Sequence, residues 1–387
     1  MTTFGALFVP DELREAVSDG AWLRAMLEAE RALANAQALA DVVPAHAAAA
    51  IAEGCDPDLY DIERMCREGR AAGNPVEPLV RALREEVGGE AAPFVHFGAT
   101  SQDVLDSAAM LVARDARRLI DDELDGVAAA CARLTGEHRT SLMAARTLLQ
   151  QAVPTTFGLK AAGWLVALLD ARAHLANFVP TAQLGGAGGT LAALGDNGTE
   201  VVRLFARELE LAEPAVPWHA HRGRIAELAA ALNAVAAVAA KIGLDVVLLA
   251  QTEVGEVSEA EGGASSTMPQ KRNPVRATLA RACARGMHAQ LSVLTNGEHE
   301  HERAAGAWQA EWGALSEALA LTGGAAAAIR ECLERLEVHT ERMRENLRAD
   351  TLAEAEQFTP DAERPEQYLG SAGAFIDRAL ARYAESR

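Results

Sequence analysis

The chain has 387 residues, which is long enough to bury a large core and to form more than one structural unit. Half of the residues are hydrophobic but only 4% are aromatic, and the many alanines favour closely packed helices. With 55 acidic and 36 basic residues the formal net charge is -19, which argues against nucleic acid and anionic membranes as partners.

The five cysteines form neither a CxxC pair nor a zinc-binding spacing, a pattern that fits a reducing compartment. The first residues lack the basic start of a signal peptide. No apolar run reaches the length of a membrane span without a polar interruption. We therefore expect a cytoplasmic protein without membrane segments.

The first part of the chain shows helical spacing of its apolar residues, interrupted by Gly, Asn and Pro between residues 73 and 78. The pattern predicts helices over 22–39, 45–53, 58–70 and 79–87. These segments predict an N-terminal helical domain over 1–95.

From residue 100 the helical patterns become long, and no convincing strand pattern separates them. The predicted helices cover 100–137, 153–177, 197–210, 220–257 and 274–296. The stretch 224–257 is apolar almost all round, which is typical of a helix inside a bundle or an oligomer core. We expect a central helical-bundle domain over 96–330 and a short C-terminal helical domain over 331–387, with a last helix near 369–382.

A polar loop rich in Gly and Ser precedes Asn273 and Pro274, which look like the N-cap and first turn of the helix that follows. The free N–H groups at such a helix start, with Lys271 and Arg272 beside them, suit a carboxylate. An ordinary surface loop is an equally good interpretation of these residues alone.

Polar groups also gather in the segment 96–103, where Thr100 or Ser101 can cap the next helix and Asp103 stands near its third position. In the segment 146–156 an arginine and two glutamines precede Pro154, which we expect to open a helix, and this combination suits a bidentate grip on a carboxylate. Taken singly, a plain helix cap and a solvated arginine explain the two segments as well.

The run of Glu and His residues over 298–303 suggests a metal site, but it lacks the HExxH spacing. Residues His299 and His301 would point in different directions on a helix. An exposed charged helix is the better interpretation, and we predict no metal. The glycines of 185–189 indicate a tight turn rather than a phosphate loop, and His219 is expected to be structural.

Together these segments resemble the three signature regions of the fumarase/aspartase superfamily, in the same order along the chain. The superfamily loop reads G-S-S-x-M-P-x-K-x-N, and this chain departs from it at Ala264, which replaces the glycine. The matching residues are Ser265, Ser266, Met268, Pro269, Lys271 and Asn273.

Within the superfamily the chain is most similar to bacterial 3-carboxy-cis,cis-muconate cycloisomerases. Adenylosuccinate and argininosuccinate lyases carry R-T-H-x-Q in the second region, with the histidine taking part in acid/base catalysis. This chain has Leu148 at that position. Because leucine cannot move a proton, the resemblance favours the cycloisomerases and leaves open which residue replaces the histidine.

The resemblance implies an all-α fold with a long central helix bundle and small N- and C-terminal helical units. It also implies a homotetramer in which each active site takes its three regions from three subunits. The implied substrate is a small polycarboxylate. No metal or organic cofactor is required, because fixed charges can stabilise the enediolate.

The implied reaction closes a lactone: one carboxylate of the substrate attacks a double bond while an acid protonates the carbon next to another carboxylate. By analogy, Ser265 transfers this proton, with Ser266 as the alternative, and Lys271 lowers the serine pKa. Two histidines, His96 and His301, are further candidate proton carriers. The residues expected to bind the substrate are Thr100, Ser101, Gln102, Arg146, Gln150, Met268, Asn273 and Arg303.

Two other functions remain open at this point. One is a lyase that eliminates fumarate from a substituted succinate, like the adenylosuccinate, argininosuccinate or nitrosuccinate lyases. The other is a structural protein that kept the fold and lost catalysis. The presence of Ser265, Lys271 and Asn273 argues against the second.

Overall fold

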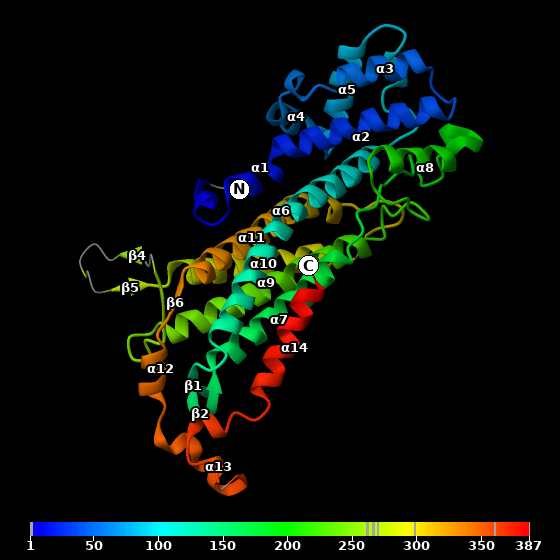
Figure 1. Ribbon diagram of the computed structural model, residues 1–387. Helices are drawn as coiled ribbons and strands as arrows, with labels where there is room; N and C mark the ends of the chain where they lie inside the picture. The colour runs from blue at the N-terminus through cyan, green and yellow to red at the C-terminus, as the bar shows by residue number, and fades with distance from the viewer. Residues whose placement is uncertain are drawn as a thin grey trace.

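The computed structural model describes residues 3–260, 263–264, 268, 271–297, 299–359 and 361–386. The expected all-α architecture is confirmed: long helices run side by side through the centre of the molecule, and the described strands form only short two-stranded sheets (Figure 1).

The N-terminal part of the chain folds into short helices placed around one longer helix, α2. Helix α2 packs against the central helix α6 and against α3 and α8. The elements are η1 (Thr3–Leu7), α1 (Asp11–Ala16), α2 (Asp19–Leu39), α3 (Ala45–Gly54), η2 (Pro57–Leu59), α4 (Ile62–Glu68), η3 (Gly69–Ala71), α5 (Val76–Val87) and η4 (Ala92–Phe94).

The central bundle is built from α6, α7, α9, α10 and α11, which pack on one another through buried alanine, leucine and valine side chains. Small side chains let the helix axes approach closely, as the alanine-rich composition predicted. The elements are α6 (Ser101–Glu137), α7 (Phe157–Ala176), η5 (Ala192–Asn197), α8 (Gly198–Glu208), α9 (Gly223–Leu249), α10 (Val275–Leu294) and α11 (Ala307–Glu334).

The last part of the chain crosses one end of the bundle and returns along it as α14, which packs against α7 and α6 (Figure 1). Its helical elements are α12 (Thr340–Asn346), η6 (Ala349–Leu352), α13 (Ala353–Phe358), η7 (Pro365–Gln367) and α14 (Ala372–Glu385). The strands, paired as β1-β2, β3-β6 and β4-β5, are β1 (Leu142–Thr147), β2 (Gln150–Thr156), β3 (Val257–Glu259), β4 (Gly263–Ala264), β5 (Arg272–Asn273) and β6 (Leu336–Val338).

Some of the sequence-based boundaries were wrong. Pro154 does not open a helix but lies in β2, and α7 begins after Thr156, whose hydroxyl accepts a hydrogen bond from the Leu159 N–H at 3.1 Å. Asn273 is not an N-cap, because it lies in β5 and α10 begins at Val275. Helix α11 was not among the predicted helices, although it is one of the longest in the bundle.

Helix α9 is, within the described part of the chain, the one helix long and apolar enough to cross a membrane by length and composition. It packs against α7, α10 and α11 inside the bundle. Only 44% of its most apolar window is buried within this chain. Ala230, Ala237 and Leu244 are exposed and stand seven residues apart, on one face of the helix. We call these three residues the apolar stripe of α9.

Candidate active site

The first signature region lies at the start of α6, and its centre is the buried carboxylate of Asp103. This carboxylate accepts hydrogen bonds from the backbone N–H groups of Thr100 (3.0 Å), Gly185 (2.9 Å) and Gly186 (2.9 Å). Its Oδ1 also lies 2.7 Å from Nε2 of His219. Asp103 is therefore the common partner of three features predicted from the sequence: the helix cap at Thr100, the glycine turn and the structural His219.

The glycine turn must be glycine to reach this position. A Cβ on Gly185 would lie 2.7 Å from the His219 ring, and one on Gly186, whose φ is +66°, would lie 2.7 Å from the carbonyl oxygen of Gly98. Any side chain would push the turn away from Asp103. Glycine thus lets three segments that are far apart in the sequence share one carboxylate.

Next to Asp103, a charge network is buried between α6, α9 and α11. The guanidinium of Arg222 donates to both oxygens of Asp106 (2.7 and 3.0 Å) and to Glu311 (2.5 Å). Asp106 also accepts from Nε1 of Trp308 at 3.0 Å and from the Gln102 amide at 3.0 Å. Burial lowers the pKa of Arg222, but the two carboxylates outweigh it and raise the pKa above its usual value. We call Asp106, Arg222 and Glu311 the buried charge network.

The buried charge network fixes the orientation of Gln102, a predicted substrate-binding residue. The Gln102 amide nitrogen donates to Asp106 and to the carbonyl oxygen of His219, both at 3.0 Å. Its carbonyl oxygen must therefore point the other way, where it accepts from Nη1 of Arg303 at 3.3 Å. Two predicted substrate-binding residues are thus brought into contact from positions 201 residues apart.

In the part of the chain that the structure describes, the hydrogen-bond acceptors around Arg303 are all neutral. Its Nη2 donates to the carbonyl oxygens of Gly186 (2.7 Å) and Ala187 (2.8 Å), in addition to the contact with Gln102. Among the ion pairs formed by the described residues, none involves Arg303. A fixed guanidinium with no carboxylate partner is suited to bind an anionic group from outside the chain.

His96, a predicted proton carrier, forms a pair with Glu30 of α2: Nδ1 lies 2.5 Å from the carboxylate. The Glu30 carboxyl group is completely buried, and among the residues that the structure describes its second oxygen has no hydrogen-bond partner. Burial opposes the charged imidazole, but Glu30 outweighs burial and raises the pKa of His96. The ring also lines a cavity of about 470 Å³ together with Ser101, so it can exchange protons with that space.

We predict that Glu30→Gln lowers the pKa of His96 below its usual value of about 6.5, since burial then acts without the carboxylate. An NMR titration of the His96 ring, assigned by comparison with His96→Gln, measures this. In the unmodified protein the pair stabilises the fold fully below about pH 6.5, and this contribution disappears as the pH rises through the raised pKa. An identical His96 pKa in both proteins would disprove the role of Glu30.

The second signature region is the β1-β2 hairpin. Arg146, a predicted carboxylate ligand, donates to both oxygens of the fully buried Glu256 at 2.9 and 2.6 Å. Gln150 is exposed and lines a cavity of about 480 Å³ with Arg146 and Arg348. Most of the charge of Arg146 is therefore compensated within the chain, and its direct contact with substrate stays a prediction.

The tip of this hairpin is unusual. Leu148 and Leu149 form a two-residue turn in which both have positive φ angles, 49° and 63°. Such a conformation costs roughly 1–2 kcal/mol per residue for a side chain with a Cβ. The side chains are 96% and 75% exposed. An exposed apolar turn in a strained conformation is typical of a segment that another molecule covers.

In the third signature region, the predicted proton-transfer residues Ser265 and Ser266 lie outside the described residues. Lys271 is exposed, and its backbone N–H donates to the carbonyl oxygen of Met268 at 3.0 Å. Met268 is 42% exposed. Because it is exposed, Lys271 is accessible to a ligand.

The start of α10, which we expected to receive the substrate carboxylate, already holds a carboxylate of the chain. The Arg276 and Ala277 N–H groups donate to the two oxygens of the buried Glu259 at 3.1 and 2.9 Å. That prediction was wrong, because Glu259 arrives at this helix end from β3. Any cation for the substrate in this region must come from side chains such as Lys271.

Within the described part of the chain, no group of three or more His, Cys, Asp or Glu residues is placed to hold a metal ion. His301 is exposed and lies outside any helix, with a φ of 44°. His299 is not on an exposed helix either; its buried ring lies 3.2 Å from Glu311. The predicted charged helix over 298–303 was therefore wrong for the residues that the structure describes.

The three signature regions do not meet within one chain. Figure 1 shows the start of α6, the β1-β2 hairpin and the β4-β5 segment at three separate places of the molecule. Helix α6 alone, with 37 residues, separates the first region from the second by about 55 Å at 1.5 Å per residue. One chain therefore carries three separate parts of a candidate site.

The buried charge network was missed in the sequence. Asp106 and Glu311 are charged residues on the helix faces that pack into the protein core, three or four residues from buried apolar positions. Because charged residues are rarely buried unless they are paired, this pattern could have indicated a buried ion pair. Arg222 had no such signal, because it lies in the turn just before α9. Its role depends on contacts 89 and 116 residues away.

Comparison with known proteins agrees with this architecture. A family model described as lyase matches residues 9–287. The nitrosuccinate lyase of Streptomyces davaonensis is 49% identical over 86% of this chain and 74% of its own length. The 3-carboxy-cis,cis-muconate cycloisomerase of Bradyrhizobium diazoefficiens is 44% identical over 89% of this chain and 80% of its own length.

Among solved structures, the 3-carboxy-cis,cis-muconate lactonizing enzyme from Pseudomonas putida superimposes with a TM-score of 0.92. It is 36% identical to this chain, and the match covers 99% of both chains. The resemblance read from the three signature regions is thus confirmed. The chain belongs to the lyase family of the fumarase/aspartase superfamily, and its relatives include both cycloisomerases and lyases.

Proposed function

We propose that the protein is a cytoplasmic cycloisomerase that converts 3-carboxy-cis,cis-muconate to a carboxymuconolactone. The observation that carries the proposal is the leucine turn. Leu148 occupies the position where the histidine-dependent lyases of the superfamily hold their acid/base group, and its side chain points away from the rest of its own chain. The 44% identity to a cycloisomerase over most of both chains supports the same reaction.

In the proposed reaction, an oxygen of one substrate carboxylate forms a C–O bond to a double-bond carbon. The electron pair of that double bond moves to the neighbouring carbon and into its carboxylate as an enediolate, and a proton added at this carbon completes the lactone. Arg303 binds the carboxylate that takes up the charge. The Ser265 hydroxyl delivers the proton, with Ser266 as the alternative, and Lys271 stabilises the oxyanion that remains.

The proposed site needs residues from several subunits of a homotetramer, because the three regions lie apart in one chain. Two features of the described residues support self-association: the exposed apolar stripe of α9 and the exposed leucine turn. In the tetramer the hairpin of one subunit, with Arg146 and Gln150, would face the Thr100–Ser101 end and Arg303 of another.

We predict that replacing the turn by Leu148→Asn with Leu149→Gly weakens assembly about tenfold or more. The pair Asn-Gly adopts positive φ readily, so the hairpin keeps its shape while the apolar contact is lost. Light scattering over a dilution series measures the effect, and Leu59→Ser, at another exposed leucine, serves as the control. Unchanged assembly, or a monomeric unmodified protein, would contradict the proposed tetramer.

The second candidate is a lyase that eliminates fumarate from a substituted succinate, and the relative named nitrosuccinate lyase favours it at 49% identity. An ultraviolet absorbance assay distinguishes the two reactions. Loss of the diene absorbance of 3-carboxy-cis,cis-muconate supports the cycloisomerase, whereas fumarate formed from nitrosuccinate supports the lyase. No reaction with either substrate would support a silent fold.

A further inference from the structure

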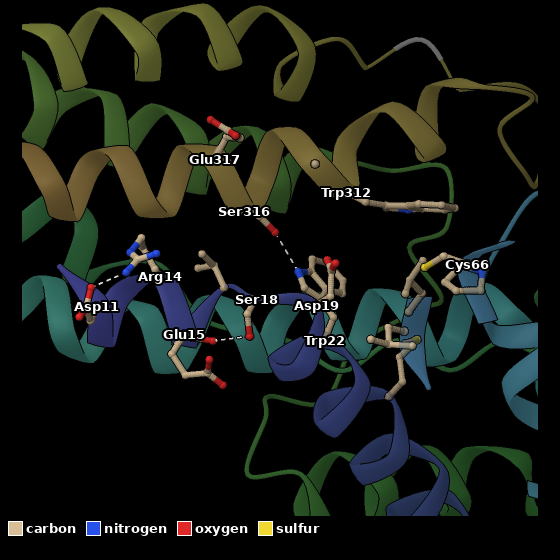
Figure 2. Close-up of a pocket in the computed structure, with 16 residues that line it drawn as sticks. Asp11, Arg14, Glu15, Ser18, Asp19, Trp22, Cys66, Trp312, Ser316 and Glu317 are labelled. Atoms are coloured by element: carbon tan, nitrogen blue, oxygen red, sulfur yellow. Dashed lines mark hydrogen bonds and ion pairs between the residues drawn. The ribbon is translucent and has the colours of Figure 1, made fainter. Parts of the chain in front are cut away.

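Two cavities border the first turns of α6, and they differ in the charge of their walls. Leu105 lines the larger one, of about 720 Å³, which also borders α2 and α11 (Figure 2). Its charged lining residues are Asp11, Arg14, Glu15, Asp19 and Glu317. Ser101 lines the smaller cavity, of about 470 Å³, and its charged or titratable neighbours there are Glu77, Arg81, Arg84, Glu85 and His96. Because an excess of carboxylates repels anions, a polycarboxylate suits the smaller cavity better.

We call the smaller one the histidine cavity, and its two arginines differ in their partners. Arg81 lies 2.7 Å from Glu68 and 3.7 Å from Glu77, so its charge is compensated within the chain. Arg84 donates to the carbonyl oxygen of Val95 at 3.2 Å, and it forms no ion pair with the residues that the structure describes. The exposed guanidinium of Arg84 is therefore available to an anion from outside the chain.

His96 faces the same cavity, and Glu30 holds its ring from α2. Nδ1 lies 2.5 Å from the Glu30 carboxylate, and the His96 side chain is only 12% exposed. The His96 backbone has a φ of 60°, a conformation that is uncommon for a residue with a Cβ and that is frequent at functional sites. Nε2 forms no hydrogen bond with the described residues, so the charged ring offers this N–H to the cavity.

The charge of the His96 ring depends on groups from three helices. Burial lowers its pKa, the carboxylates of Glu30 on α2 and Asp103 on α6 raise it, and Arg84 on α5 lowers it. The carboxylates prevail, so the pKa of His96 lies above its usual value of about 6.5. The ring is thus charged below this raised pKa and loses its charge as the pH rises through it.

We propose that the histidine cavity binds one carboxylate of the polycarboxylate substrate, with Arg84 and the charged ring of His96 as its cations and the Ser101 hydroxyl as a further donor. Glu30 acts through His96 and is a positioning residue. The start of the 37-residue helix α6 adds partial positive charge at Ser101. The inference rests on the proposed function, in which Arg303 binds another carboxylate of the same substrate.

Tricarballylate, a saturated tricarboxylate that cannot form a lactone, serves as the probe. Calorimetric titration into the full-length protein in its native assembly is done between pH 7 and 9.5, where the carboxyl groups of the probe stay ionised. We expect the affinity to fall about fivefold or more as the pH rises, because the cavity loses one cation. Absence of binding at pH 7, or an affinity that does not change with pH, would overturn the proposal.

Glu30→Gln keeps an acceptor for Nδ1 but removes the charge, so the fall in affinity should move to lower pH and binding at pH 7 should weaken about fivefold. The control is Glu86→Gln, which removes an exposed carboxylate of α5 outside the cavity and should not move the fall. Arg84→Met should weaken binding about fivefold at every pH. If Glu30→Gln and Arg84→Met both bind like the unmodified protein, the carboxylate does not lie in the histidine cavity.

Kinetics with 3-carboxy-cis,cis-muconate separates this inference from the proposed reaction. For Glu30→Gln at pH 7 we expect KM to rise about fivefold with little change in kcat, because the carboxylate is bound equally in the ground state and the transition state. Turnover with an unchanged KM would contradict the role of the cavity but not the reaction. Tricarballylate binding with the expected pH dependence, in a protein that does not convert the muconate, would leave the carboxylate site standing and refute the reaction.

Discussion

Replacing Arg222 by methionine is expected to lower the free energy of unfolding by about 3–5 kcal/mol, one of the largest effects of any single substitution in this chain. The guanidinium is 2% exposed and joins two carboxylates that are 2% and 5% exposed. Without it, Asp106 and Glu311 would remain buried as unpaired charges, and hydrogen bonds to other residues would not compensate for them.

Urea unfolding followed by circular dichroism, at two protein concentrations to detect any contribution from assembly, measures this loss. The control is Arg203→Met, which breaks an exposed pair with Glu200 and should change stability by less than about 1 kcal/mol. Adding Asp106→Leu and Glu311→Met to Arg222→Met should recover part of the loss, because no unpaired charge then remains. If Arg222→Met unfolds like the unmodified protein, the buried charge network does not stabilise the fold.

Arg303→Ala is expected to reduce kcat/KM for 3-carboxy-cis,cis-muconate by about 100-fold or more, the effect of losing a fixed cation that binds a carboxylate. The three neutral acceptors around Arg303 are two carbonyl oxygens of a glycine-rich turn and the amide of Gln102. None of them compensates the positive charge, so the substrate would supply the negative partner.

Steady-state kinetics over a range of substrate concentrations gives the measurement. Arg303→Lys keeps the charge but loses the planar fork, so it should retain part of the activity, and Arg378→Ala, at an exposed position of α14, should behave like the unmodified protein. A kcat/KM for Arg303→Ala within threefold of the unmodified value would remove Arg303 from the proposed site.

The fold could be predicted from the sequence in its main features, because helical periodicity and abundant alanine dominate the chain. The cap of α6 at Thr100 was predicted correctly for a local reason: its partner Asp103 is only three residues away. The β1-β2 hairpin was not predicted. Its turn is Leu148-Leu149 rather than a Gly or Asn pair, so the usual local signal of a hairpin is missing.

Only part of the candidate site could be predicted from the sequence, because the contacts that build it join residues far apart along the chain. Arg303 and Gln102 were both named from the sequence, but their contact spans 201 residues. The capping of α10 by Glu259 could not be foreseen, because it depends on where β3 lies. The roles of Ser265, Ser266, Met268 and Asn273, and the three-domain division, stay predictions.

The central claim is that the protein adds a carboxylate oxygen to a double bond of 3-carboxy-cis,cis-muconate. The most direct measurement is an NMR analysis of the product formed from this compound by the purified protein in deuterium oxide. We expect a lactone of unchanged carbon skeleton that carries one deuterium on the carbon next to a carboxylate, with no such product from the Ser265→Ala variant. Recovery of unchanged diene, or a lactone without deuterium at that carbon, would contradict it.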